Sequence, residues 1–189
     1  MQTEEPAEDD RTARAVLSHF WGEVAARDVF FRRMGGGFSG SRVWEVICAS
    51  GQRYCLKRWP IPGPGCERLG QIHRLLATLA EIRQSGLLAV PCVPVPIAAR
   101  DGKTWTEVQG RLWELAPLLE GKAIEPCEVT FPHIAAAMQG VAALHVAMEH
   151  AARAAPSDFS YSGTTAPSPS LKKRRELANR WYSERAQLT

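Results

Sequence analysis

The sequence predicts an α+β fold, in which a mostly antiparallel sheet with one packed helix is followed by further helices. Short runs rich in β-branched and aromatic residues occur in 29–59 and in 95–115, with Gly-containing turn pairs between them. Apolar residues recur at helical spacing in 67–83 and in 130–155. The sheet and its helix would form a first lobe, and the later helices would begin a second.

The N-terminal segment, residues 1–28, is interpreted as a tail and a helix. Residues 1–11 are acidic and are expected to be frayed, and the helix is predicted over 12–28. Its apolar stripe consists of Leu17, Phe20, Trp21 and Val24. A short strand is expected next, over 29–34.

A hairpin is predicted after the glycine-rich turn that follows this strand. Its strands are 42–48 and 52–59, and Ser50-Gly51 offers a two-residue turn between them. With that turn, Cys55 would lie opposite Val46.

The next elements are a helix and a second antiparallel unit. The helix over 67–83 is expected to end at Gly86. After a proline-rich entry we expect a meander of three short strands, 95–100, 104–108 and 111–115. The first lobe would therefore extend over 29–116.

The remainder, 117–189, is interpreted as a partial helical C-lobe. An alanine-rich helix is expected from Thr130 to Ala155, and a second helix over 171–187. Between them, 156–170 consists mainly of Ser, Thr, Pro and Gly and is expected to be a flexible segment.

Composition excludes several classes of protein. A net charge of +3 is too small to indicate a nucleic-acid partner. Five cysteines without a C-x-x-C pair favour reduced thiols over a disulfide framework or a zinc site. No run approaches eighteen apolar residues, so no membrane contact is expected, and the acidic N-terminus favours a cytoplasmic protein.

The most informative motif is a glycine-rich turn followed, one hairpin later, by a lysine on a strand. Gly35, Gly37 and Gly40 satisfy G-x-G-x-x-G, and Lys57 lies in the returning strand of the hairpin. A dinucleotide site needs a helix directly after the glycines, but this sequence continues as a strand. A strand, a glycine loop, a hairpin and a strand lysine are the parts with which a kinase-type fold covers ATP phosphates.

These elements, with Arg111-Leu112-Trp113-Glu114-Leu115 and Leu144-His145, resemble the aminoglycoside phosphotransferase group. That group includes choline-kinase-like and homoserine-kinase-like enzymes of the protein-kinase-like fold. The resemblance covers about 31–145 and implies that 29–116 is a protein-kinase-like, nucleotide-binding N-lobe followed by a partial C-lobe. It also implies an ATP or GTP cofactor with Mg²⁺ and a small-molecule hydroxyl as acceptor.

The resemblance also implies roles for individual residues. Lys57 would neutralise the α- and β-phosphates, and Glu114, Leu115 and Ala116 would meet the adenine through backbone groups. The residues that would fold over the phosphates are Gly36, Gly37, Phe38, Ser39, Gly40 and Ser41.

The acidic partner of the lysine departs from the family pattern. Kinase-type sites hold this lysine with a glutamate on the following helix. Relatives often have Glu where this chain has Ile72, beside His73, which leaves Glu67 in the first turn as a weak candidate. A helix-start acid that only complements the helix dipole is the alternative.

The catalytic aspartates of the family are missing from the sequence. The chain has no His-x-Asp motif, and Asp158-Phe159-Ser160 imitates a magnesium-binding Asp-Phe-Gly without a catalytic loop before it. We therefore expect no catalytic residue and no metal ligand in this chain, which would be a truncated and inactive phosphotransferase. The alternatives are a nucleotide-binding pseudokinase or regulatory module, and a remnant that binds no nucleotide.

Overall fold

The computed structural model describes residues 4–22, 28–35, 40–121 and 124–154. The chain divides into two compact units, and all of these residues belong to the first, Met1–Asp158. The predicted segments 156–170 and 171–187 lie outside the described residues, as do Gly36, Gly37, Phe38 and Ser39.

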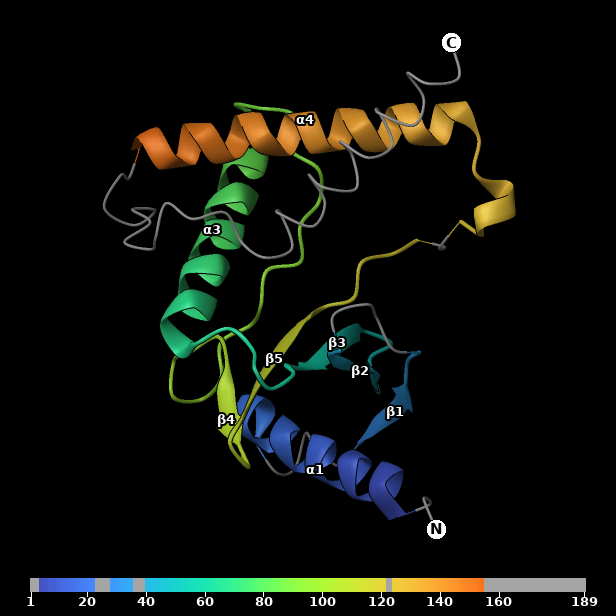
Figure 1. The fold of residues 1–189 in the computed structure, drawn as a ribbon. Helices are drawn as coiled ribbons and strands as arrows, with labels where there is room; N and C mark the ends of the chain where they lie inside the picture. Colours follow the sequence, from blue (N-terminus) through green and yellow to red (C-terminus); the bar gives the residue numbers. More distant parts are fainter. Residues whose placement is uncertain (1–3, 23–27, 36–39, 122–123, 155–189) are drawn as a thin grey trace, which may run out of the picture. The chain divides into compact units, whose positions relative to one another are not determined.

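An antiparallel sheet of five strands organises this unit (Figure 1). The strands follow the order β1-β2-β3-β5-β4, and helices before, between and after them in the chain complete an α+β fold. This confirms the predicted fold class. The strands are β1 Val29–Arg33, β2 Arg42–Cys48, β3 Arg53–Arg58, β4 Thr106–Val108 and β5 Arg111–Pro117.

Helix α1, Glu4–Trp21, packs on one face of the sheet and forms the hydrophobic core with it. Trp44 and Trp113 are fully buried there and stack with ring centroids 5.3 Å apart. The other main core residues are Ala13, Val16, Leu17 and Phe20 from the helix and Val46, Leu56 and Leu115 from the sheet.

The helix begins at Glu4, well before the predicted start at residue 12, so the expectation of a frayed acidic segment was wrong for 4–11. Asp9 forms ion pairs with Arg42 and Arg58 on the sheet. Asp10 accepts a hydrogen bond of 2.6 Å from the indole Nε1 of Trp44. The acidic turn is thus fixed by residues 33 or more positions away in the sequence, which local helix signals do not reveal.

The hairpin between β2 and β3 has a different register from the predicted one. Glu45, not Val46, lies opposite Cys55. The Cys48 amide bonds the carbonyl of Gln52 at 2.9 Å, which leaves three residues in the loop. Its last residue, Gly51, has φ +83°, the left-handed conformation that closes three-residue hairpin loops.

The first strand of the predicted meander, 95–100, is not formed in the structure. These residues contain no strand, although the Ile97 amide donates to the Leu115 carbonyl at 2.8 Å. Pro94 and Pro96 have no amide hydrogen, so this segment cannot build a continuous ladder beside β5.

Helix α3, Cys66–Ser85, ends at Gly86, whose φ of +70° makes it the left-handed cap that the sequence predicted. A 3₁₀ turn, η1 Pro126–Glu128, precedes helix α4, Phe131–Ala154, which contacts α3. The bounds of both α-helices agree with the predicted ones within two residues.

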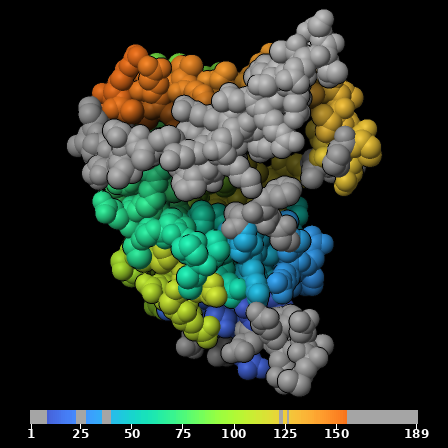
Figure 2. Space-filling model, in the orientation of Figure 1, coloured from blue at the N-terminus to red at the C-terminus, as the bar shows by residue number. Residues whose placement is uncertain are grey.

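Helix α4 exposes most of its apolar side chains. Phe131 is 81% exposed and Met138 63%, and α4 contributes to the surface in Figure 2. Among the described residues it is the one helix long and apolar enough to cross a membrane, judged by length and composition alone. Core helices of soluble proteins pass the same test, so this is weak support for a membrane span.

Candidate nucleotide site

The face of the sheet opposite α1 carries charged side chains. Because cross-strand partners share a face, the pairs Glu45–Cys55, Cys55–Ala116 and Lys57–Glu114 place these residues on one surface. Trp44, Leu56 and Leu115 alternate with them and point into the core. The alternation therefore separates a face whose centre is apolar, with the ion pairs of Asp9 beside it, from a face that carries Lys57, Glu114 and Glu45.

Lys57 is held from two directions on this face. Its Nζ lies 3.4 Å from Oε1 of Glu114, directly across from it on β5. The same Nζ lies 3.3 Å from the ring centroid of Trp59, a cation–π contact. The lysine side chain is 25% exposed, so the ammonium group is oriented and still accessible.

Glu114 in turn contacts a buried histidine from α3. Nε2 of His73 lies 2.7 Å from Oε2 of Glu114, and Nδ1 lies 2.7 Å from Oγ1 of Thr104. The His73 side chain is 3% exposed, and Thr104 lies just before β4. Thr104, His73, Glu114 and Lys57 therefore form one continuous polar chain.

The charge state of Glu114 follows from these contacts. Burial would raise the pKa of its carboxyl, but the hydrogen bond from His73 and the charge of Lys57 outweigh burial. The pKa of Glu114 is therefore lower than the ordinary 4.5, and Glu114 is ionised at neutral pH.

A cavity of about 460 Å³ opens beside this polar chain. Lys57, Trp59, His73 and Glu114 line its polar part. The apolar part consists of Cys55, Ile72, Leu76, Pro94, Pro96, Ala116, Pro117, Leu118 and Leu119. An apolar cavity of this size with a few convergent polar groups is typical of small-molecule sites.

The cysteine in this cavity is a packing residue. Burial raises the pKa of the Cys55 thiol, and the nearby negative charge of Glu114 raises it further. The thiol therefore stays protonated at neutral pH. All five cysteines are free, as the sequence analysis expected.

The structure brings several of the predicted site residues together. Lys57, Glu114 and Ala116 all line the cavity. Gly40 has φ +70°, and Ser41, next to it, is buried. The predicted roles of these two residues toward phosphates remain predictions, since the rest of the loop is outside the described residues.

The two glutamates proposed for the site have different surroundings from those the sequence suggested. Glu67 is exposed in the first turn of α3 and has no ion pair among the described residues. Glu114, expected to act through its backbone, reaches Lys57 with its carboxylate. Leu115 uses its carbonyl to bind Ile97.

Sequence reasoning missed His73 and Trp59 as members of the site. His73 stands one residue after Ile72, where relatives have glutamate, and shares a buried helix face with Leu69. A polar residue at a core position of an amphipathic helix is the signal that could have identified it. Trp59 directly follows β3, two residues after Lys57, and therefore shares its side of the strand.

A second carboxylate on the same face belongs to a different kind of cluster. Glu45 is 1% exposed and forms ion pairs with Arg32 and Arg53. The hydrogen bond from Arg53 lowers the pKa of the Glu45 carboxyl. Burial opposes this shift, and Arg32 reinforces it. Both oxygens are engaged, and Glu45 does not line the cavity described above.

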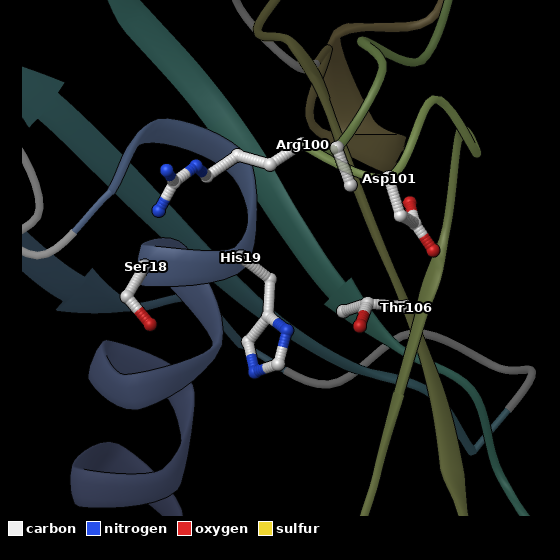
Figure 3. A pocket seen from close by; sticks show the side chains of 6 residues that line it. Ser18, His19, Arg100, Asp101 and Thr106 are labelled. Atoms are coloured by element: carbon white, nitrogen blue, oxygen red, sulfur yellow. The ribbon is translucent and has the colours of Figure 1, made fainter.

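Another cavity, of about 350 Å³, lies at the end of α1 and contains none of the predicted site residues. Figure 3 shows Ser18 and His19 from α1 facing Arg100, Asp101 and Thr106. The Arg100 amide binds the His19 carbonyl at 2.8 Å, so this region joins α1 to the segment before β4.

No group of three or more His, Cys, Asp or Glu side chains that could hold a metal ion occurs among the described residues. Asp158 lies outside them.

Comparison with known proteins identifies the family of this chain. Residues 31–188 match the family described as "APH: Phosphotransferase enzyme family". A solved structure of amicoumacin kinase hAmiN, in complex with AMP-PNP, Ca²⁺ and Ami, is 18% identical, with a TM-score of 0.42. The match covers 67% of this chain and 36% of that one.

No curated protein matches the sequence. The family match includes most of the chain, with the glycine loop, Lys57 and Glu114 inside it. The chain belongs to the phosphotransferase enzyme family.

Proposed function

We propose that this protein is a phosphotransferase-family nucleotide-binding protein, in which the charged face of the sheet holds ATP or GTP. Family membership supports the lineage, and the amicoumacin kinase structure is itself a complex with AMP-PNP and Ca²⁺. The acceptor that the lineage implies is a hydroxyl group on a small molecule.

The observation on which this proposal rests is the position of Lys57. Its ammonium group lies at a cavity of about 460 Å³, oriented by Glu114 and Trp59, on the strand that follows the glycine loop and hairpin. A lysine in this position can bind phosphate oxygens by charge-assisted hydrogen bonds. The apolar lining provided by Ala116 and Leu118 suits a purine base.

A divalent cation does not fit the described residues as well as a nucleotide does. Mg²⁺ takes carboxylate oxygens and phosphate oxygens as ligands. Glu114 is already engaged by Lys57 and His73, and the described residues contain no cluster of three candidate ligands. Any Mg²⁺ would therefore depend on the nucleotide phosphates for most of its ligands.

We further infer that residues 1–189 bind nucleotide without transferring phosphate. A kinase-type site requires an aspartate to accept the proton of the substrate hydroxyl and another to bind the metal. The sequence has no His-x-Asp motif. Two forms of the proposal remain, namely part of a longer phosphotransferase and a nucleotide-binding pseudokinase or regulatory module.

Calorimetric titration of the chain with ATP or GTP and Mg²⁺ tests the proposal. Lys57→Ala should weaken binding about 10- to 100-fold, because a hydrogen bond to a charged group contributes about 1.5–3 kcal/mol. Lys103→Ala is the matched control, because Lys103 also pairs with an acid, Asp101, and lies over a tryptophan, Trp105. Equal affinities of the two variants would contradict the role of Lys57.

Incubation with labelled ATP and a panel of aminoglycosides and amino alcohols tests the second inference. We expect binding without product. Turnover would contradict it, and turnover abolished by Asp158→Asn would identify that aspartate as a functional residue. Absence of both binding and turnover would favour a remnant that binds no nucleotide.

A further inference from the structure

We propose that Glu114, supported from behind by His73 and Thr104, is the carboxylate that positions Lys57 for the phosphates. His73 is then a positioning residue that acts through Glu114. This inference rests on the proposed nucleotide function and adds to it the identity of the acidic partner. The role that kinase-type sites give to a helix glutamate is here divided between a strand, which supplies the acid, and a helix, which supplies the histidine.

The backbone supports this assignment. Lys57 and Glu114 are direct cross-strand partners on β3 and β5, so their Cβ atoms are held about 5 Å apart by the ladder itself. A glutamate on α3 would depend on the placement of the helix against the sheet. Ile72 occupies the helix position at the cavity, and its side chain cannot accept a hydrogen bond.

Each oxygen of Glu114 has a separate partner. Oε1 lies 3.4 Å from Nζ of Lys57, and Oε2 lies 2.7 Å from Nε2 of His73. The shorter contact is to a side chain that is 3% exposed, so the carboxylate is fixed mainly from the helix side. The plane of the carboxylate, and with it the direction offered to Lys57, is therefore set by His73.

The hydrogen-bond directions follow from the chemistry of the groups. An ionised carboxylate only accepts, so Nε2 of His73 must carry the hydrogen in this contact. A ring that carries its one hydrogen on Nε2 leaves Nδ1 as an acceptor, and the Thr104 hydroxyl, 2.7 Å away, then donates to it. Thr104 thereby fixes the tautomer that His73 needs in order to donate to Glu114.

Trp59 restricts the position of the Lys57 ammonium group from another side. Its ring lies 3.3 Å from Nζ of Lys57, so Glu114 and Trp59 together restrict where the ammonium can move. All three residues line the same cavity. The N–H groups not used by Glu114 are thus available to a ligand in that cavity.

The first test is a series of affinities, measured per folded protein by calorimetry. His73→Leu should weaken ATP binding about 3- to 10-fold, and His73→Gln, which restores a donor, should recover most of that loss. Glu114→Gln should weaken binding about tenfold, and adding His73→Leu to it should have no further effect. A role in stability alone would lower the unfolding free energy of His73→Leu and leave its affinity unchanged.

The sign of the Glu114→Gln effect is decisive. If Glu114 merely competes with phosphate for Lys57, removing its charge will tighten nucleotide binding. Tighter binding, or equal binding by His73→Leu and the unsubstituted chain, would overturn the inference. In either case the Lys57→Ala result would still judge the nucleotide function separately.

A second test needs no nucleotide. Two-bond ¹H–¹⁵N NMR correlations of the His73 ring should show the Nε2–H tautomer, and Lys57→Ala should shift the Nε2 resonance through Glu114. Lys103→Ala should leave it unchanged. A ring protonated on Nδ1 alone, or one insensitive to Lys57→Ala, would overturn the inference even if the chain binds no nucleotide.

Discussion

The two faces of the sheet differ in what surrounds their buried groups. On the α1 face, Trp44 and Trp113 stack within a closed apolar layer. On the opposite face, ionised Glu45 and Glu114 lie among cations, and one of them borders a cavity. The first arrangement stabilises the fold without any ligand, whereas the second leaves a lysine available to one.

The two glutamates show how burial alone fails to indicate function. Both are largely buried, and both have a lowered pKa. Glu45 pairs with Arg32 and Arg53, which are 61% and 48% exposed and do not line the 460 Å³ cavity, whereas Glu114 pairs with Lys57, which lines it. The difference that matters is whether the paired cation borders a cavity that can hold a ligand.

The largest expected effect is on the apolar face. Trp44→Ala should lower the unfolding free energy by about 3–5 kcal/mol, because it removes a fully buried aromatic ring. Phe30→Ala is the control from the charged side of the sheet, where Phe30 is 63% exposed and the loss should stay within about 0.5 kcal/mol. Denaturant unfolding measures both, and similar losses would contradict the comparison.

A smaller effect should separate the two glutamates. Glu45→Gln should lower the unfolding free energy by about 1–3 kcal/mol, because it weakens charged hydrogen bonds to Arg32 and Arg53. Its nucleotide affinity should change by less than about twofold. Glu114→Gln should show the reverse, with the larger change in affinity. If both variants lose affinity equally, the charged face acts as one electrostatic unit.

Acid should destabilise the protein through the same two residues. The pKa of each carboxyl is lower in the folded state than its ordinary 4.5. Their stabilisation is therefore fully present above that pH and is lost as the pH falls through the folded pKa. The double variant Glu45→Gln/Glu114→Gln should lose less stability between neutral pH and acid. An unchanged pH profile would contradict the assigned charge states.

The smallest expected effect concerns the loop between β2 and β3, which sets the register of the hairpin. Gly51→Ala should destabilise by about 1 kcal/mol, because Gly51 has φ +83° and a Cβ is disfavoured there. Gly140→Ala, inside α4 with open space around it, should instead stabilise by about 0.5–1 kcal/mol. Thermal unfolding of both variants checks the two signs.

The strands and α3 could be predicted because their signals are local. The alternation in 42–48 and 53–58 and the Gly86 cap identify these elements almost to the residue. The register of the hairpin could have been predicted as well. Placing Cys55 opposite Val46 would mix the two faces, whereas the observed pairing joins Trp44 with Leu56 and Glu45 with Cys55.

The remaining features depend on contacts between distant segments. Neither the start of α1, held by Arg42 and Arg58, nor the meeting of His73 with Glu114 is encoded in neighbouring residues. The lysine partner was sought on the helix because kinase-type sites place it there. In this chain the strand directly opposite supplies it.

Because α1 lies before the family match, the matched segment and the folded unit begin at different residues. The family match begins at residue 31, whereas α1 ends at Trp21 and supplies four buried residues of the core. A polypeptide begun at the family boundary would expose Trp44 and Val46 to water and leave Arg42 and Arg58 without Asp9. Annotation by family alone would thus cut through a hydrophobic core, and a transplanted or recombined version of this domain has to carry its leading helix with it.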